Sequence, residues 1–251
     1  MTLMIKAAAL GLAMTLALGT SAGAQDPSKG LGTWGLRGKV GAYPVGMQLT
    51  VRGGRDFVSG HYFYVRTLID IPLTGGMEGD TLTLKEPSGG VFRLHFVSNV
   101  PGRKETLNFD NSTSLSGTWT QGAKTLPVEI GLDSEYGGGR RERHYEQVTD
   151  EPDAVFEARV GGFLKAVLKG DRATAARFAA YPLLVKDGDG ARTIRNKAEF
   201  LARWDKIFTP KFVAKLRTAV PHEMFVRQGS AMVGDGDIWF DAKGAKVFNN
   251  Y

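Results

Sequence analysis

Residues 45–55 have the sequence VGMQLTVRGGR, and this stretch decides the fold of the first half of the chain. Its apolar side chains occupy every second position: Val45, Met47, Leu49 and Val51. A period of two is typical of a β-strand with one buried face, and the glycine pair that follows is typical of a hairpin turn. The stretch therefore predicts a strand that turns back along a neighbour.

The same pattern continues from Leu36 to about Asp133, with no segment of helical period. Alternating apolar segments lie at 57–65, 69–73, 82–84, 92–96, 115–119 and 126–132, and turns rich in Gly or Pro separate them. Such spacing predicts an all-β antiparallel meander or barrel of about eight strands over residues 31–133. A closed barrel is the simplest form, because closure leaves no strand edge exposed.

Residues 134–153 differ from both flanks. Three glycines, Gly137–Gly139, precede a basic cluster at 140–143 and then several acidic residues. The segment has few apolar side chains, so we interpret it as an interdomain linker in which His144 is solvated.

The period becomes helical in residues 154–251. Phe156, Val160, Phe163 and Val167 share one helix face, and helix N-caps are predicted at Asp171, Asn196 and Thr209. A strand is expected at 181–185, followed by the turn 187–190, and four more strands are expected at 224–226, 231–233, 238–240 and 245–248. This order predicts an α+β domain in which helices cover a curved antiparallel sheet.

Two resemblances follow from these motifs. Tyr181-Pro182-Leu183, the 200–210 segment FLARWDKIFTP and the 234–240 segment GDGDIWF resemble the nuclear transport factor 2-like (cystatin-like, SnoaL-like) superfamily. That resemblance implies a cone-shaped domain whose mouth serves ligand binding, catalysis or association. The N-terminal half, with Gly60-x-Tyr62-x-Tyr64 and Leu115-x-Gly117-x-Trp119, is similar to small β-barrel domains of uncharacterised secreted bacterial proteins.

The first 24 residues have the composition of a secretory signal peptide. Lys6 precedes the apolar segment 7–19, and the small residues Ala22-Gly23-Ala24 form a cleavage site of the A-x-A type. The apolar segment is shorter than the roughly 20 residues that span a membrane. We therefore expect a periplasmic or secreted protein with no transmembrane segment after cleavage.

The chain contains no cysteine, which excludes several kinds of chemistry. Disulfides, thiolate metal sites, iron–sulfur clusters, thioether-linked haem and cysteine nucleophiles all require that residue. A lipoprotein anchor requires it as well. Because the sequence also contains no nucleophile elbow, phosphate-binding loop or dinucleotide fingerprint, we expect no cofactor.

The sequence also predicts no metal site. The four histidines, His61, His95, His144 and His222, never recur at the spacing of a zinc motif. Asp187-x-Asp189 and Asp235-x-Asp237 are interpreted as turns, because both clusters lie where a hairpin turn is needed and Asp-Gly is typical of turns. An EF-hand loop that starts at Asp187 would also need an oxygen ligand at Ala191 and a glycine at Arg192. His61 and His95 are expected at solvent-facing or core-edge positions.

The candidate binding site is the mouth of the expected cone. Its residues come from separate elements: Tyr181, Trp204, His222, Asp237 and Trp239. The favoured hypothesis is a non-catalytic binding module for a small molecule or an envelope component. The alternative is a hydrolase or isomerase that uses His222 with Asp205 or Asp237.

Charge is unevenly distributed along the chain. Residues 154–251 carry 17 basic and 10 acidic side chains, whereas residues 25–133 carry 11 and 10. The excess indicates either an anionic partner or simply the solvated face of amphipathic helices. We expect no nucleic-acid partner because no basic strand is interleaved with aromatic residues, and the sequence leaves an oligomer open.

Overall fold

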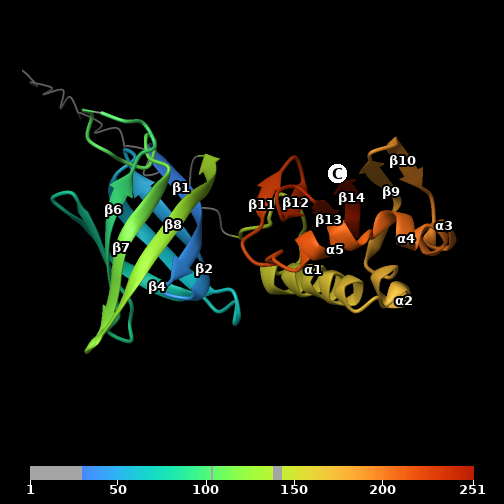
Figure 1. Ribbon diagram of the computed structural model, residues 1–251, viewed down its shortest axis with the longest axis horizontal. Helices are drawn as coiled ribbons and strands as arrows, with labels where there is room; N and C mark the ends of the chain where they lie inside the picture. The colour runs from blue at the N-terminus through green and yellow to red at the C-terminus, as the bar shows by residue number, and fades with distance from the viewer. Residues whose placement is uncertain (1–29, 103, 138–142) are drawn as a thin grey trace, which may run out of the picture.

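The computed structural model describes residues 30–102, 104–137 and 143–251, which form a β-barrel followed by an α+β part (Figure 1). The expected signal peptide, residues 1–24, lies outside the described residues, as do Arg140 and Arg141 of the expected linker. No helix among the described residues is both long and apolar enough to cross a membrane.

The first part is a closed antiparallel barrel of eight strands, which confirms the predicted all-β domain. In chain order the strands are β1 (Leu31–Val40), β2 (Tyr43–Arg52), β3 (Asp56–Tyr64), β4 (Ile71–Glu78), β5 (Thr81–Lys85), β6 (Val91–Val97), β7 (Ser114–Gln121) and β8 (Lys124–Gly137). Each strand pairs with the next, and β8 closes the barrel on β1. The alternating residues Met47, Leu49 and Val51 all point into the buried interior.

The carboxylate of Glu86 is buried beside the apolar core of the barrel. Glu86 accepts hydrogen bonds from the Tyr62 hydroxyl at 3.0 Å and from the indole nitrogen of Trp119 at 2.7 Å. Burial and the neighbouring Tyr64 and Glu86 raise the pKa of Tyr62 above its usual value. Two donors therefore satisfy a buried acid that would otherwise be costly in this environment.

The second part contains a six-stranded sheet and five helical segments. Its elements are α1 (Asp153–Leu168), α2 (Arg172–Ala175), β9 (Ala179–Asp187), β10 (Gly190–Ile194), α3 (Lys197–Ala202), α4 (Trp204–Ile207), α5 (Pro210–Leu216), β11 (Phe225–Arg227), β12 (Ser230–Val233), β13 (Ile238–Asp241) and β14 (Gly244–Asn250). The strand order is β10-β9-β14-β13-β12-β11. The expected purely antiparallel sheet is wrong in one pairing, since β14 runs parallel to β9.

Local capping agrees with the sequence at three helices. The side chains of Asp171, Asn196 and Thr209 each accept a hydrogen bond from a backbone N–H in the first turn of α2, α3 and α5. Asp189 N–H donates to the Asp187 carboxylate at 3.0 Å, so the Asp187–Gly190 segment is the expected turn. These bonds satisfy donors that helix and turn geometry leaves open.

Aromatic side chains fill the space between the helices and the sheet. Phe163 of α1 contacts the rings of Phe208, Phe240 and Phe248, and Phe200 contacts Trp204 at 5.7 Å between ring centroids. All of these rings are buried. The centre of the second part is therefore a packed core.

The interpretation of residues 134–153 as a linker is wrong at both ends. Strand β8 extends to Gly137, and the segment that starts at Arg143 packs against the second part. Tyr145 and Val148 are buried there, and the Tyr145 hydroxyl donates to Glu157 at 2.8 Å. Of the described residues in this segment, Tyr145, Val148 and Thr149 are buried and only two of them are apolar, which explains why composition predicted no packing.

The packed core makes a direct stability prediction. Trp204 is 5% exposed, so Trp204→Ala should lower the free energy of unfolding by about 3–5 kcal/mol, as expected for a buried aromatic truncation. Urea unfolding followed by circular dichroism measures the change. The matched control is Val155→Ala at an exposed position of α1, which should change stability by less than about 0.5 kcal/mol. An equally small effect of Trp204→Ala would contradict the packed core.

Candidate functional site

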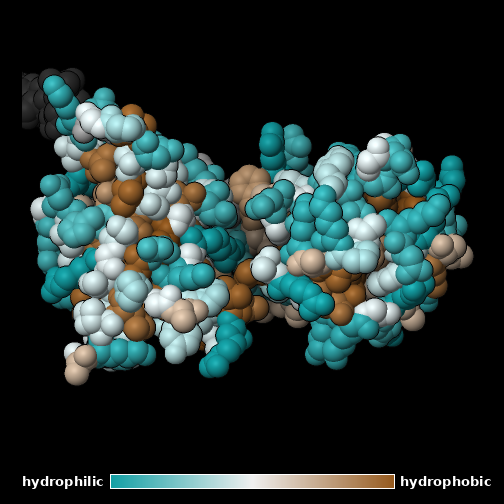
Figure 2. Space-filling view, in the orientation of Figure 1, coloured by the Kyte–Doolittle hydropathy of each residue, from teal (hydrophilic) through white to brown (hydrophobic). Residues whose placement is uncertain are grey.

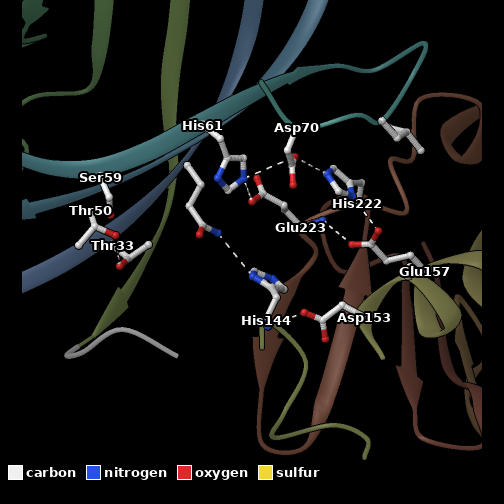
Figure 3. A pocket seen from close by; sticks show the side chains of 13 residues that line it. Thr33, Thr50, Ser59, His61, Asp70, His144, Asp153, Glu157, His222 and Glu223 are labelled. Carbon is white, nitrogen blue, oxygen red and sulfur yellow. Dashed lines mark hydrogen bonds and ion pairs between the residues drawn. The ribbon is translucent and has the colours of Figure 1, made fainter. Parts of the chain in front are cut away.

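The barrel and the second part enclose a cavity of about 530 Å³ between them (Figure 3). Strands β1 to β3 and the loop before β4 supply one wall, while the segment before α1, helix α1 and the loop before β11 supply the other. The polar residues that line it are Thr33, Gln48, Thr50, Ser59, His61, Asp70, His144, Asp153, Glu157, His222 and Glu223. The site therefore depends on both parts of the chain.

Strand register builds the barrel wall of this cavity. Thr50 on β2 lies opposite Thr33 of β1 and Ser59 of β3, and Gln48 lies opposite His61. The hydroxyls of Thr33 and Thr50 are 3.0 Å apart. Because side chains alternate across a strand and Leu49 points inward, these residues lie on the outer face of the barrel.

His222 connects the two walls. Its Nε2 lies 2.9 Å from Asp70 Oδ1 of the barrel, and its Nδ1 lies 2.7 Å from Glu157 Oε2 of helix α1. Burial disfavours the charge, but hydrogen bonds to Asp70 and Glu157 outweigh burial and raise the pKa of His222 to about 10. The side chain is 11% exposed, so the imidazolium is an almost buried cation held between two carboxylates.

A second histidine, His61, lies beside His222 and Asp70 and has its own carboxylate partner. His61 Nε2 contacts the carboxylate of Glu223 and lies 3.5 Å from Asp70 Oδ1. Although burial opposes it, the hydrogen bond to Glu223 and the charges of Glu223 and Asp70 raise the pKa of His61. Burial would raise the pKa of Asp70, but the hydrogen bond from His222 and the charges of His61 and His222 lower it.

Glu157 organises the second part around the cavity. Besides bonding His222, it accepts hydrogen bonds from the Tyr145 hydroxyl at 2.8 Å and from the backbone N–H of Glu223 at 3.2 Å. Burial and the charge of Glu157 raise the pKa of Tyr145. Glu223 has a φ of 47°, a backbone conformation that non-glycine residues rarely adopt and that clusters at functional sites.

His144 is part of the wall and is not the solvated residue that the linker interpretation predicted. Its Nε2 lies 2.8 Å from the carbonyl oxygen of Met224, and its Nδ1 lies 3.4 Å from the Gln48 amide nitrogen. Its backbone N–H donates to the Asp153 carboxylate at 2.7 Å. Asp153 begins α1, so the same carboxylate fixes the approach of the chain to the helix.

The two parts also dock through an aromatic ring and a guanidinium. Phe63 points out of the barrel, is fully buried, and its ring centroid lies 4.4 Å from that of His222. The Arg37 guanidinium lies over the Phe63 ring and donates to the carbonyl oxygens of His222 and Glu223 at 2.9 and 3.1 Å. Arg37 therefore holds the backbone that carries both site residues.

The five residues expected to line a cone are not brought together around this cavity. Only His222 lies on it. Tyr181 packs on Phe200 and donates to the Ala176 carbonyl oxygen, and burial raises its pKa to about 12. Trp204 is in the core, Trp239 is half-buried on β13, and Asp237 pairs with Lys215 at 3.3 Å.

Sequence reasoning missed most of the residues that line the cavity. His61, Asp70, His144, Glu157 and Glu223 come from five different elements, so no local spacing joins them. One signal was present, because Gln48-x-Thr50 and Ser59-x-His61 place polar side chains on the outer face of paired strands. Nothing in that alternation distinguishes a face covered by another part of the chain from one covered by water.

The excess basic residues remain outside this site. Lys165, Lys169, Arg177, Lys197 and Lys211 are exposed on or beside the helices of the second part. Hydrophilic side chains cover much of both parts on the face shown in Figure 2.

Comparison of the chain with protein-family models, with curated proteins and with solved structures gives no match.

Gly46 tests the docking of the two parts. A Cβ at this position of β2 would collide with the Phe63 ring and the Arg37 guanidinium. Gly46→Ala should therefore displace both side chains, separate the barrel from the second part and increase the radius of gyration in small-angle X-ray scattering. The matched control is Gly76→Ala on β4, where no atom lies within 4 Å of an added Cβ. Identical scattering from the two variants would contradict the docking role.

His222 tests the charge cluster itself. His222→Ala leaves Asp70 and Glu157 without their shared cation, and should lower the free energy of unfolding by about 2–3 kcal/mol. His95→Ala, at an exposed position of β6, is the control and should change stability by less than about 0.5 kcal/mol. Equal stability of the two variants in urea unfolding would contradict the stabilising role of His222.

Proposed function

We propose that this chain is an exported, non-catalytic binding protein whose ligand occupies the cavity between the barrel and the second part. The observation that carries the proposal is the convergence of three histidines and four carboxylates from both parts on one cavity of about 530 Å³. Cavities of this size that lie between two parts of a chain are common places for small-molecule sites. A binding site at this position also accounts for the almost buried charges.

The lining favours a small, polar ligand that carries positive charge. Thr33, Thr50 and Ser59 offer hydroxyl donors and acceptors along one wall. Four carboxylates line the cavity, but only two of its histidines have raised pKa values, so the lining carries an excess of negative charge. Such a field attracts cations and repels anions.

The hydrolase or isomerase alternative has less support. A general base needs an unprotonated nitrogen within reach of a substrate proton. Both ring nitrogens of His222 lie within hydrogen-bond distance of carboxylate oxygens, which accept protons and do not donate them when ionised. Asp205 pairs with Arg172, and Asp237 pairs with Lys215, so each proposed catalytic acid has a different partner.

Two broader proposals accompany this function. The first is that the second part belongs to the nuclear transport factor 2-like superfamily. Its support is the sheet topology: the first hairpin, β9–β10, pairs through β9 with the last strand, β14, and helices lie before and after this hairpin in the chain. The second is export to the periplasm or beyond, supported by the composition of residues 1–24. An anionic partner for the exposed basic residues remains a separate expectation.

Native mass spectrometry of the protein isolated from its native envelope tests the proposal. We expect a chain that begins at Gln25 and carries a non-covalent organic molecule. Thr50→Trp should abolish this adduct, because the indole fills the cavity from the hydroxyl wall. Thr118→Trp, on β7 away from the cavity, is the matched control and should retain the adduct. A wild-type protein without any organic adduct, or an adduct that survives Thr50→Trp, would contradict the proposal.

A further inference from the structure

Three side chains from three different elements converge at one end of the cavity. They are His61 of β3, Asp70 of the loop before β4 and Glu223 of the loop before β11 (Figure 3). One ligand atom from each lies within 4.8 Å of the other two. His61 and Glu223 are mostly buried, and Asp70 is about half exposed, so the group is reachable from the cavity.

The distance between His61 and Asp70 suits a metal ion of ordinary size. His61 Nε2 and Asp70 Oδ1 are 3.5 Å apart. Two ligands on a tetrahedral zinc ion, each about 2.1 Å from the metal, are separated by about 3.4 Å. Glu223 contacts His61 more closely than this, so that carboxylate would move back by a small side-chain rotation.

The surrounding residues hold these ligands in the way that metal sites require. His222 bonds Asp70 from the side away from His61, and its other nitrogen bonds Glu157. Glu157 also accepts the backbone N–H of Glu223, and Arg37 binds the carbonyl oxygen of the same residue. The bond from His222 orients the Asp70 carboxylate, and the two bonds to the backbone of Glu223 fix the chain that carries its carboxylate; such outer contacts strengthen metal binding.

We propose that His61, Asp70 and Glu223 bind a divalent first-row transition ion, with Zn²⁺ as its probe. One imidazole and two carboxylates suit zinc, manganese or iron better than calcium or magnesium, which prefer oxygen ligands alone. Three protein ligands leave at least one coordination position for water or for a ligand in the cavity. The inference deepens the proposed function, on whose cavity it rests, by naming a cation that the negative field would hold.

A metal ion here would also join the two parts of the chain. His61 and Asp70 belong to the barrel, whereas Glu223 belongs to the second part. Binding to the docked form alone stabilises that form by mass action. We therefore expect the melting temperature of the whole chain to rise with the concentration of free Zn²⁺, and to keep rising after the site is filled.

Isothermal titration of the untagged, chelator-treated protein with zinc chloride tests the proposal. We expect one Zn²⁺ per chain, and Asp70→Asn and Glu223→Gln should each weaken binding about tenfold or more, because loss of a residue that merely orients a metal ligand already costs about tenfold. Asp70 lies in a half-exposed loop, so its variant should stay folded even if Glu223→Gln does not. Asp189→Asn in the exposed 187–190 turn is the control and should bind zinc as the wild type does.

Two results would overturn the metal site. The first is a folded wild-type protein that takes up no zinc, or whose zinc affinity is unchanged in Asp70→Asn. The second is tighter binding of calcium or magnesium than of zinc in the same titration, which would assign the site to a hard cation. Neither result affects the organic adduct that Thr50→Trp should abolish, so failure of the metal site and failure of the proposed function remain distinguishable.

Discussion

The His222 imidazolium between Asp70 and Glu157 is the interaction on which the arrangement of this molecule depends. A cation that is almost buried is stable only when opposite charge and hydrogen bonds replace its hydration. Here one carboxylate comes from the barrel and the other from helix α1. Neither part alone supplies both carboxylates, so this interaction forms only in the docked arrangement.

The outer face of β1 to β3 shows how a barrel strand serves two purposes. Inward residues such as Leu49 build the barrel core, while Gln48, Thr50 and His61 face the second part. Phe63 follows the same outward alternation and is nonetheless fully buried, because His222 and Arg37 cover it. Docking therefore turns an ordinary polar strand face into one wall of a cavity.

Local patterns predicted the architecture well and the site poorly. Alternation and glycine turns predicted the barrel, and Asp171, Asn196 and Thr209 predicted helix starts, because these signals act within a few residues. The parallel pairing of β14 with β9 depends on residues about 60 positions apart, and no local pattern encodes it. The site likewise depends on residues that are far apart in the sequence, since 153 positions separate Asp70 from Glu223.

The aromatic residues explain why the sequence grouped side chains that the structure does not gather around the cavity. Trp204 and Tyr181 have polar tips, and the sequence cannot show whether such side chains line a pocket or complete a core. In this chain the rings of Phe163, Phe200 and Phe208 already occupy the space between helices and sheet. The cavity lies instead where polar residues of two separately packed parts meet, and His222 is the one residue of the expected set that lines it.

Anomalous X-ray diffraction at the zinc edge, from crystals of the protein grown with Zn²⁺, tests the central claim most directly. The claim is that the barrel and the second part together form one cation-binding cavity. We expect one strong anomalous peak within about 2.2 Å of ligand atoms of His61, Asp70 and Glu223, with His222 still between Asp70 and Glu157. A cavity without a peak, or a barrel and second part that no longer touch through His222, would contradict the account.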